Sequence, residues 1–86
     1  MTPAATIHYN KEENKLHVDL LIEKGEMIKA DVFDCSGKCV EHIIDKSCKA
    51  GQFNMVRKIK NMVCGMYFLR VVNSNNECNV IRFSVS

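Results

Sequence analysis

Thiols are the side chains of this 86-residue chain with the clearest capacity for chemistry. There are five cysteines, at Cys35, Cys39, Cys48, Cys64 and Cys78. Because the number is odd, at least one cannot pair within the chain, whereas a disulfide framework predicts an even number. Cys35 and Cys39 are separated by three residues instead of the two that are common in zinc knuckles, and no second knuckle follows. We therefore expect free thiols that pack as small apolar side chains, with no metal and no other cofactor.

The histidines offer little support for catalysis. His8 and His17 have polar neighbours in alternating segments, and His42 follows Glu41. No spacing places two histidines on one strand face beside a carboxylate, and a titratable side chain needs a pocket to be catalytic. Cys64 would need a histidine base to act as a nucleophile. We expect no catalytic residues in this chain.

The carboxylates form no recognisable binding motif. Asp31, Asp34, Asp45 and Glu41 have the sequence contexts of turn and surface groups, and neither a glycine-rich phosphate loop nor a calcium loop is present. A small domain filled by its own side chains also has little room for a ligand cavity of about 300 Å³. These observations predict a protein that is not an enzyme and has no small-molecule substrate.

The elements that position these side chains are predicted to be β-strands. Segment 65–73 gives the strongest signal, because it is the longest apolar run, is rich in β-branched and aromatic residues, and lies between a glycine and a polar turn. Side chains alternate along a strand, so Tyr67, Leu69 and Val71 are expected to face a core from a central strand. Six other segments are also predicted strands. They are 5–10, 15–22, 27–34, 38–44, 52–59 and 78–85.

Turn signals separate these segments at intervals of roughly 8–12 residues. At positions 34–37, Asp34 can accept hydrogen bonds from nearby amides and Gly37 can adopt the left-handed conformation that closes a hairpin. Residues 45–51 are expected to be a polar connection. The lack of crossover helices excludes a parallel sheet. The pattern predicts one all-β domain over residues 1–86, an antiparallel two-sheet sandwich of about seven short strands.

Composition excludes several classes of protein. The net charge is only +2 and the basic residues are scattered, so there is no nucleic-acid footprint. No apolar run approaches the ~18 residues of a membrane helix. The N-terminus lacks the basic and apolar regions of an export signal. We expect either a cytoplasmic domain or the C-terminal part of a larger exported protein.

Four stretches together resemble the type A C-terminal sorting domain of the type IX secretion system of Bacteroidetes. Residues 32–40 are similar to the "Ile-Tyr-Asp-x-x-Gly-Lys-x-Val" hairpin of that family, and residues 50–54 to the glycine-led strand that follows it. Residues 63–71 resemble its "Leu-x-x-Gly-x-Tyr-x-x-x-Val" segment, and residues 79–86 its final basic-then-apolar strand. The resemblance spans nearly the whole chain, from Ile7 to Ser86.

The resemblance implies an Ig-like β-sandwich that acts as an address. A cargo protein carrying such a domain reaches the periplasm, passes through the type IX translocon with the help of a shuttle protein, and arrives at the outer membrane and cell surface. A sortase then removes the domain. On this reading the partners are the translocon, shuttle and sortase proteins, the outer-membrane association is transient, and the domain has no active site of its own.

Two groups of residues carry these expectations. We expect the last strand to be the partner-binding element, by strand addition if it lies at a sheet edge; it comprises Val80, Ile81, Arg82, Phe83, Ser84, Val85 and Ser86. The structural group consists of Asp34, Gly37, Lys38, Gly65 and Tyr67. In this group the Tyr67 hydroxyl is expected to hold the preceding corner of the chain.

Two alternatives remain open. The first is a stand-alone or accessory Ig-like binding module of a periplasmic or surface protein. The second is a thiol-based redox or metal-binding protein, in which the five cysteines would supply the reactive or metal-binding thiols. Exposed edge strands also leave dimerisation open.

Overall fold

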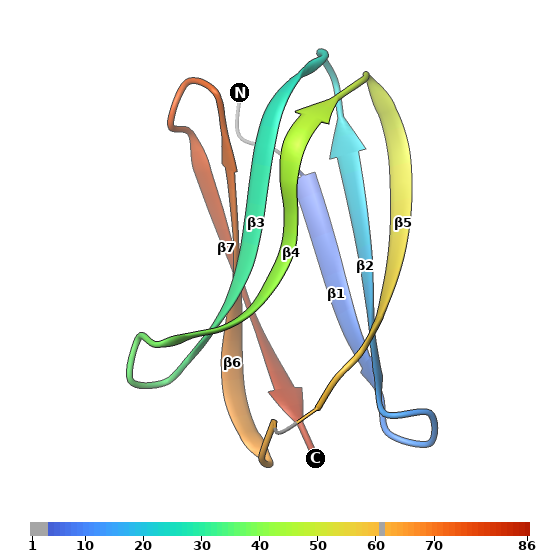
Figure 1. Cartoon of the computed structure of the whole chain (residues 1–86), viewed down its shortest axis with the longest axis vertical. Helices are drawn as coiled ribbons and strands as arrows, with labels where there is room; N and C mark the ends of the chain where they lie inside the picture. Colours follow the sequence, from blue (N-terminus) through green and yellow to red (C-terminus); the bar gives the residue numbers. More distant parts are fainter. Residues whose placement is uncertain (1–3, 61) are drawn as a thin grey trace.

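The computed structural model describes residues 4–60 and 62–86, and seven β-strands lie within them (Figure 1). Their bounds are β1 (Ala4–Asn10), β2 (Lys15–Ile22), β3 (Glu26–Asp34), β4 (Cys39–Cys48), β5 (Gly51–Lys58), β6 (Gly65–Asn73) and β7 (Cys78–Val85). One sheet has the order β1-β2-β5 and the other the order β4-β3-β6-β7, with every pairing antiparallel. The prediction of an all-β, Ig-like antiparallel sandwich is confirmed. Within these residues no helix is long and apolar enough to span a membrane.

The strand predictions hold closely, with one correction. Segment 65–73 is an interior strand, because β6 pairs with both β3 and β7. The prediction of a polar connection at residues 45–51 is wrong, because β4 continues to Cys48 and pairs with the start of β3. Cross-strand hydrogen bonding at the sheet edge outweighs the polar composition of this segment, because its outward side chains can remain in water.

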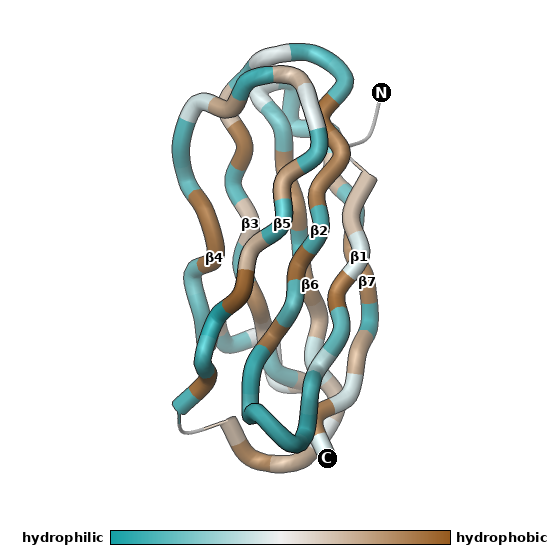
Figure 2. Tube along the Cα trace, turned by 90° about the vertical axis from the view of Figure 1, so that its right-hand side faces the viewer, coloured by the Kyte–Doolittle hydropathy of each residue, from teal (hydrophilic) through white to brown (hydrophobic). Residues whose placement is uncertain are grey.

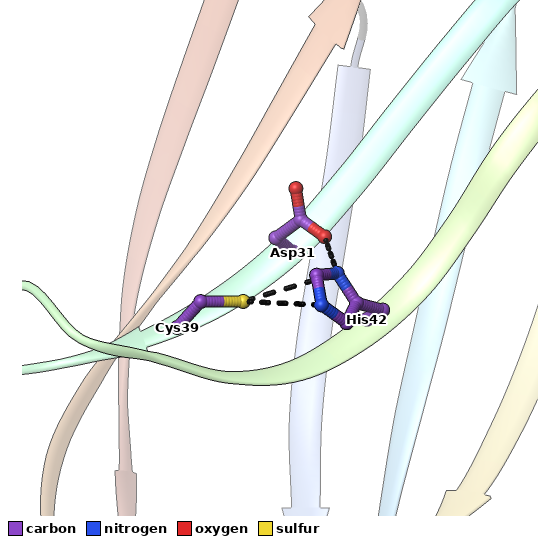
Figure 3. Close-up of side chains that lie close together, drawn as sticks. All are labelled: Asp31, Cys39 and His42. Carbon is purple, nitrogen blue, oxygen red and sulfur yellow. Dashed lines mark hydrogen bonds and ion pairs between the residues drawn. The ribbon is translucent and has the colours of Figure 1, made fainter.

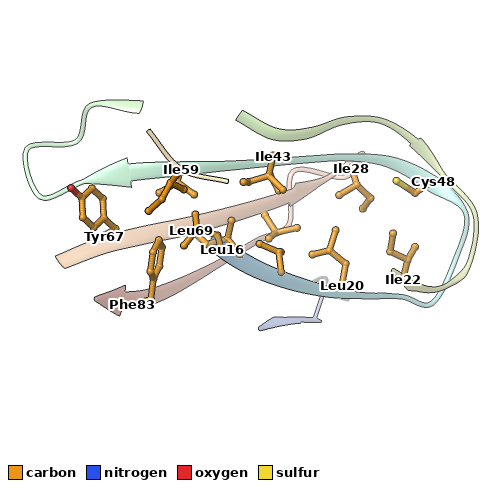
Figure 4. Packing of buried hydrophobic residues seen from close by; sticks show 14 of the residues in the cluster. Leu16, Leu20, Ile22, Ile28, Ile43, Cys48, Ile59, Tyr67, Leu69 and Phe83 are labelled. Carbon is orange, nitrogen blue, oxygen red and sulfur yellow. The ribbon is translucent and has the colours of Figure 1, made fainter. Parts of the chain in front are cut away.

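The core lies between the two sheets. Its fully buried strand residues come from β2, β3, β4, β6 and β7, and β1 and β5 add partly buried side chains such as Ile7 and Phe53. Figure 2 shows the alternation of hydrophobic and hydrophilic residues along β2. Figure 4 shows the buried side chains meeting between the sheets, where the rings of Tyr67 and Phe83 stack with centroids 5.9 Å apart. The central residues with essentially no exposure are Leu16, Val18, Leu20, Ile28, Ala30, Val32, Leu69 and Val71.

The pairing of β3 with β4 contains two irregularities that matter for the site. Ala30 pairs with Ile44 but Asp31 pairs with His42, so Ile43 is an extra residue on β4. Val32 pairs with Glu41 but Phe33 pairs with Cys39, so Val40 is a second extra residue. Each extra residue is a β-bulge, which locally reverses the face on which the following side chains lie.

Candidate functional site

Asp31 of β3 and Cys39 and His42 of β4 form a cluster on the outer face of the four-stranded sheet (Figure 3). A carboxylate oxygen of Asp31 lies 2.7 Å from Nδ1 of His42. The sulfur of Cys39 lies 3.9 Å from Nδ1 and 4.0 Å from Nε2 of the same ring. One ligand atom from each of the three side chains lies within 4.8 Å of the others.

The bulge at Val40 brings the cluster together. Cys39 and His42 are three positions apart, so in a regular strand they would point to opposite faces. The extra residue between them puts both on the outer face, opposite Phe33 and Asp31 of β3. Sequence alternation alone therefore could not have found this cluster.

Asp31 is buried. The prediction that it is a surface carboxylate is therefore wrong. It is only 3% exposed because it lies on an interior strand, between its cross-strand neighbours His42 on β4 and Arg70 on β6. The guanidinium of Arg70 lies over the ring of Phe33, 4.9 Å from its centroid. Among the described residues, the polar partner of the Asp31 side chain is His42, whose own side chain is 80% exposed.

A second correction concerns His8 and His17. The sequence suggested that no two histidines share a face beside a carboxylate, but these two are direct cross-strand partners on β1 and β2. Their ring centroids lie 6.4 Å apart, and Nε2 of His17 is 3.7 Å from a carboxylate oxygen of Glu13. Pairing between strands, which cannot be read from spacing along one strand, makes this arrangement.

The described residues line hollows at two places on the sandwich. The larger has a volume of about 340 Å³, which overturns the expectation that the domain lacks a cavity of that size. It lies where the turns before β3 and after β6 meet, and Ser74 Oγ there donates a 2.7 Å hydrogen bond to Glu26. The second has a volume of about 240 Å³ and is lined by Cys35, Cys64 and Tyr67 among others.

The five cysteines, all within the described ranges, are unpaired. Cys48 is buried and Cys39 is half-buried, while the other three are exposed. The thiol of Cys35 donates to the carbonyl oxygen of Met66 at 3.1 Å. Cys39 lies against the ring of His42, which also contacts Asp31.

The proposed structural residues lie at two corners of the chain. The Asp34 carboxylate accepts hydrogen bonds from the amide and hydroxyl of Ser36, at 2.9 and 2.6 Å, and from the amide of Lys38, at 3.0 Å. These bonds, led by that of the Ser36 hydroxyl, lower the pKa of Asp34 below its ordinary value of 3.8. Gly37 closes the turn with a φ of 89°.

Tyr67 holds the other corner. Its hydroxyl donates a 2.6 Å hydrogen bond to the carbonyl oxygen of Val63, just before β6 begins at Gly65. Desolvation by burial raises the pKa of Tyr67 above its ordinary value of 10.0, because the phenolate would be charged in a place with little water.

The last strand divides into two sets of side chains. Among the described strands, β7 is an edge strand that pairs with β6, and β1 of the other sheet lies alongside it (Figure 2). Phe83 and Val85 point into the core, whereas Val80, Arg82 and Ser84 are exposed. Of the residues expected to bind a partner, this second set and Ser86 are exposed, whereas Ile81 is half-buried against the core.

The comparisons with known proteins give one clear result. A family described as the secretion system C-terminal sorting domain matches residues 6–84. No curated protein matches the chain. The match covers all seven strands except the first two residues of β1 and the last residue of β7, so it applies to the whole folded unit. Domains of this family are generally non-catalytic signals, and they imply passage of a protein to the cell surface or its secretion. The chain belongs to the family of C-terminal sorting domains of the type IX secretion system.

Proposed function

We propose that this domain is a non-catalytic signal that directs a cargo protein through the type IX secretion system and is removed by a sortase at the cell surface. The family match over residues 6–84 is the observation that carries the proposal. The cargo would cross the periplasm before it reaches the translocon. Its association with the outer membrane would be transient, because it ends when the sortase cuts the cargo free.

The surface that we propose for recognition is the outward side of β7. Val80 is 56% exposed, and Arg82 and Ser84 follow it at alternate positions on the same face. An apolar side chain beside a cation and a hydroxyl gives a partner both contact area and an orienting charge. Since β1 lies alongside β7, we assign recognition to these outward side chains rather than to addition of a full strand at this edge.

The inward side of β7 has a different role in this proposal. Phe83 and Val85 are 8% and 4% exposed, so removing the last residues also removes core contacts. A truncated domain that fails in export could therefore simply be unfolded. Point substitutions on the outward side avoid this ambiguity.

The test is export of a reporter protein that carries a periplasmic signal peptide and this domain at its C-terminus. We expect the fusion to appear on the surface or in the medium, and Val80→Asp to reduce its export severalfold. Val56→Asp is the matched control, because Val56 is a valine of similar exposure (50%) on β5, an edge strand of the other sheet.

Each result has a defined reading. Failure of the wild-type fusion to leave the periplasm would contradict the sorting function and favour an accessory binding module. Equal export of the Val80→Asp and wild-type fusions would contradict the proposal that the outward side of β7 is the recognition surface. Release of the reporter without the domain, dependent on the sortase, is expected and would be visible as a decrease in mass of about 10 kDa, the mass of the domain.

A further inference from the structure

We propose that Asp31, Cys39 and His42 form a binding site for a single Zn²⁺ ion on the outer face of β3 and β4. The ligands would be a carboxylate oxygen, a thiolate sulfur and Nδ1 of the imidazole. Solvent would occupy the fourth position of a tetrahedral site. This inference concerns a site that the sorting function does not require, and it reverses our expectation from the Cys35–Cys39 spacing.

The types of the three ligands favour zinc. Zn²⁺ is bound in proteins by cysteine, histidine and carboxylate side chains, whereas Ca²⁺ and Mg²⁺ prefer oxygen ligands alone. Zinc does not impose a geometry through its d electrons, so it tolerates a mixed set of this kind.

The distances are close to those that an ion would require. Zinc bonds of about 2.0–2.3 Å at tetrahedral angles hold ligand atoms roughly 3.3–3.8 Å apart. The oxygen of Asp31 and Nδ1 of His42 are 2.7 Å apart, and Nδ1 and the Cys39 sulfur are 3.9 Å apart. The first pair must separate slightly and the second must approach slightly. The His42 side chain is 80% exposed and free to make this adjustment.

Burial of Asp31 supplies a reason for a cation to bind. A carboxylate taken out of water needs a compensating charge or several hydrogen bonds. Within residues 4–60 and 62–86 its side chain has a hydrogen bond to His42, while Arg70 is directed to Phe33. Zn²⁺ between the oxygen and Nδ1 would replace that hydrogen bond with two coordinate bonds.

The same atoms do not suit nucleophilic catalysis. In a cysteine–histidine pair the thiol must lie in hydrogen-bonding reach of one ring nitrogen, with that nitrogen directed at the sulfur. The Cys39 sulfur is nearly equidistant from both nitrogens, at 3.9 and 4.0 Å, so neither nitrogen is singled out as its base. Neither hollow described above is lined by the three residues.

The proton balance of binding is simple. The Cys39 thiol loses its proton to solvent as the sulfur bonds to the ion. Coordination through Nδ1 requires the His42 ring to carry its proton on Nε2. Asp31 remains a carboxylate. One proton is therefore released for each ion bound, and there is no change of oxidation state.

The test is a calorimetric titration, in which Zn²⁺ is added to the metal-free, reduced 86-residue domain and the heat of binding is measured. We expect one ion per chain and more than about tenfold weaker binding in Cys39→Ser, His42→Gln and Asp31→Asn. The controls are Cys64→Ser and His8→Gln, which remove an exposed thiol and an exposed imidazole elsewhere and should bind like the wild type.

Cobalt provides a second readout that does not depend on stability. The Co²⁺ complex should show a thiolate-to-cobalt charge-transfer band, which Cys39→Ser abolishes and Cys64→Ser retains. His42→Gln keeps the test valid if Asp31→Asn fails to fold, because the His42 side chain is largely in solvent. Absence of saturable binding by the wild type, or equal loss of affinity in the Cys64→Ser control, would overturn the assignment.

Discussion

The hydroxyl of Tyr67 donates a 2.6 Å hydrogen bond to the carbonyl oxygen of Val63, four residues earlier in the chain. Tyr67 is on the central strand β6, and its ring stacks on Phe83 of β7 in the core. The bond therefore joins the loop that enters β6 to the centre of the four-stranded sheet. Val63 itself is 75% exposed, so its side chain adds little packing at this point of the loop.

Tyr67→Phe should lower the free energy of unfolding by about 1 kcal/mol, the typical net value of one hydrogen bond. The phenylalanine ring can keep the stacking on Phe83, so the change isolates the hydroxyl. Urea unfolding followed by circular dichroism measures the effect. Tyr9→Phe is the control, since the Tyr9 hydroxyl bonds to Asn14 in an exposed position and its loss should cost less than about 0.5 kcal/mol. Equal stability of Tyr67→Phe and the wild type would show that the corner needs no such bond.

Adjacent leucines on β2 provide a test of the strand register. Leu20 is 1% exposed in the core, whereas Leu21 is 52% exposed on the opposite face. Leu20→Ala should cost about 3 kcal/mol through lost burial and a residual cavity. Leu21→Ala should change stability by less than about 0.5 kcal/mol. Urea midpoints of the two variants give the comparison, and similar losses in both would mean that the face of β2 is wrongly assigned.

Alternation of side chains allowed most of the fold to be predicted. The inward positions of β6 occupied by Tyr67, Leu69 and Val71 were expected and are buried. This works because a strand with one face on the core has a period of two, and burying the wrong face would expose its apolar set. The turn residues Asp34 and Gly37 could be predicted for a similar local reason.

The candidate zinc site could not be predicted in the same way. Its three residues come from two strands, and a bulge at Val40 changes the face of Cys39 relative to His42. A bulge is a property of the paired strands and leaves no clear pattern in one of them. The partnership of His8 with His17 likewise depends on the register between β1 and β2. Pairing therefore creates side-chain clusters that spacing along a single strand conceals.

Gly37 allows a prediction about backbone strain alone. Its φ of 89° is unfavourable for residues with a side chain, yet a Cβ at this position would meet no atom within 4 Å. Gly37→Ala should therefore destabilise the domain by roughly 1–2 kcal/mol without a steric clash. Gly37→Asn should cost less, because asparagine tolerates left-handed conformations better. Thermal or urea unfolding measures both, and the interpretation fails if alanine proves as stable as glycine.

The last prediction concerns acid stability and Asp34. Hydrogen bonds from Ser36 and Lys38 favour its charged form and hold its folded-state pKa below the ordinary value of 3.8. A group with a lowered folded pKa contributes stability that is fully present above its unfolded pKa and is lost as the pH falls through the folded pKa. The contribution of Asp34 is therefore complete above pH 3.8 and decreases below that value.

Asp34→Asn removes the charge but keeps an oxygen that can accept a hydrogen bond. We expect the variant to be less stable than the wild type near neutral pH, and the difference to shrink below pH 3.8. Urea midpoints measured over a series of pH values give this difference directly. Asp45→Asn, at an exposed position of β4, controls for the general effect of removing one negative charge. A wild-type advantage that stays constant into strong acid would mean that the Asp34 turn depends on the shape of the side chain and not on its charge.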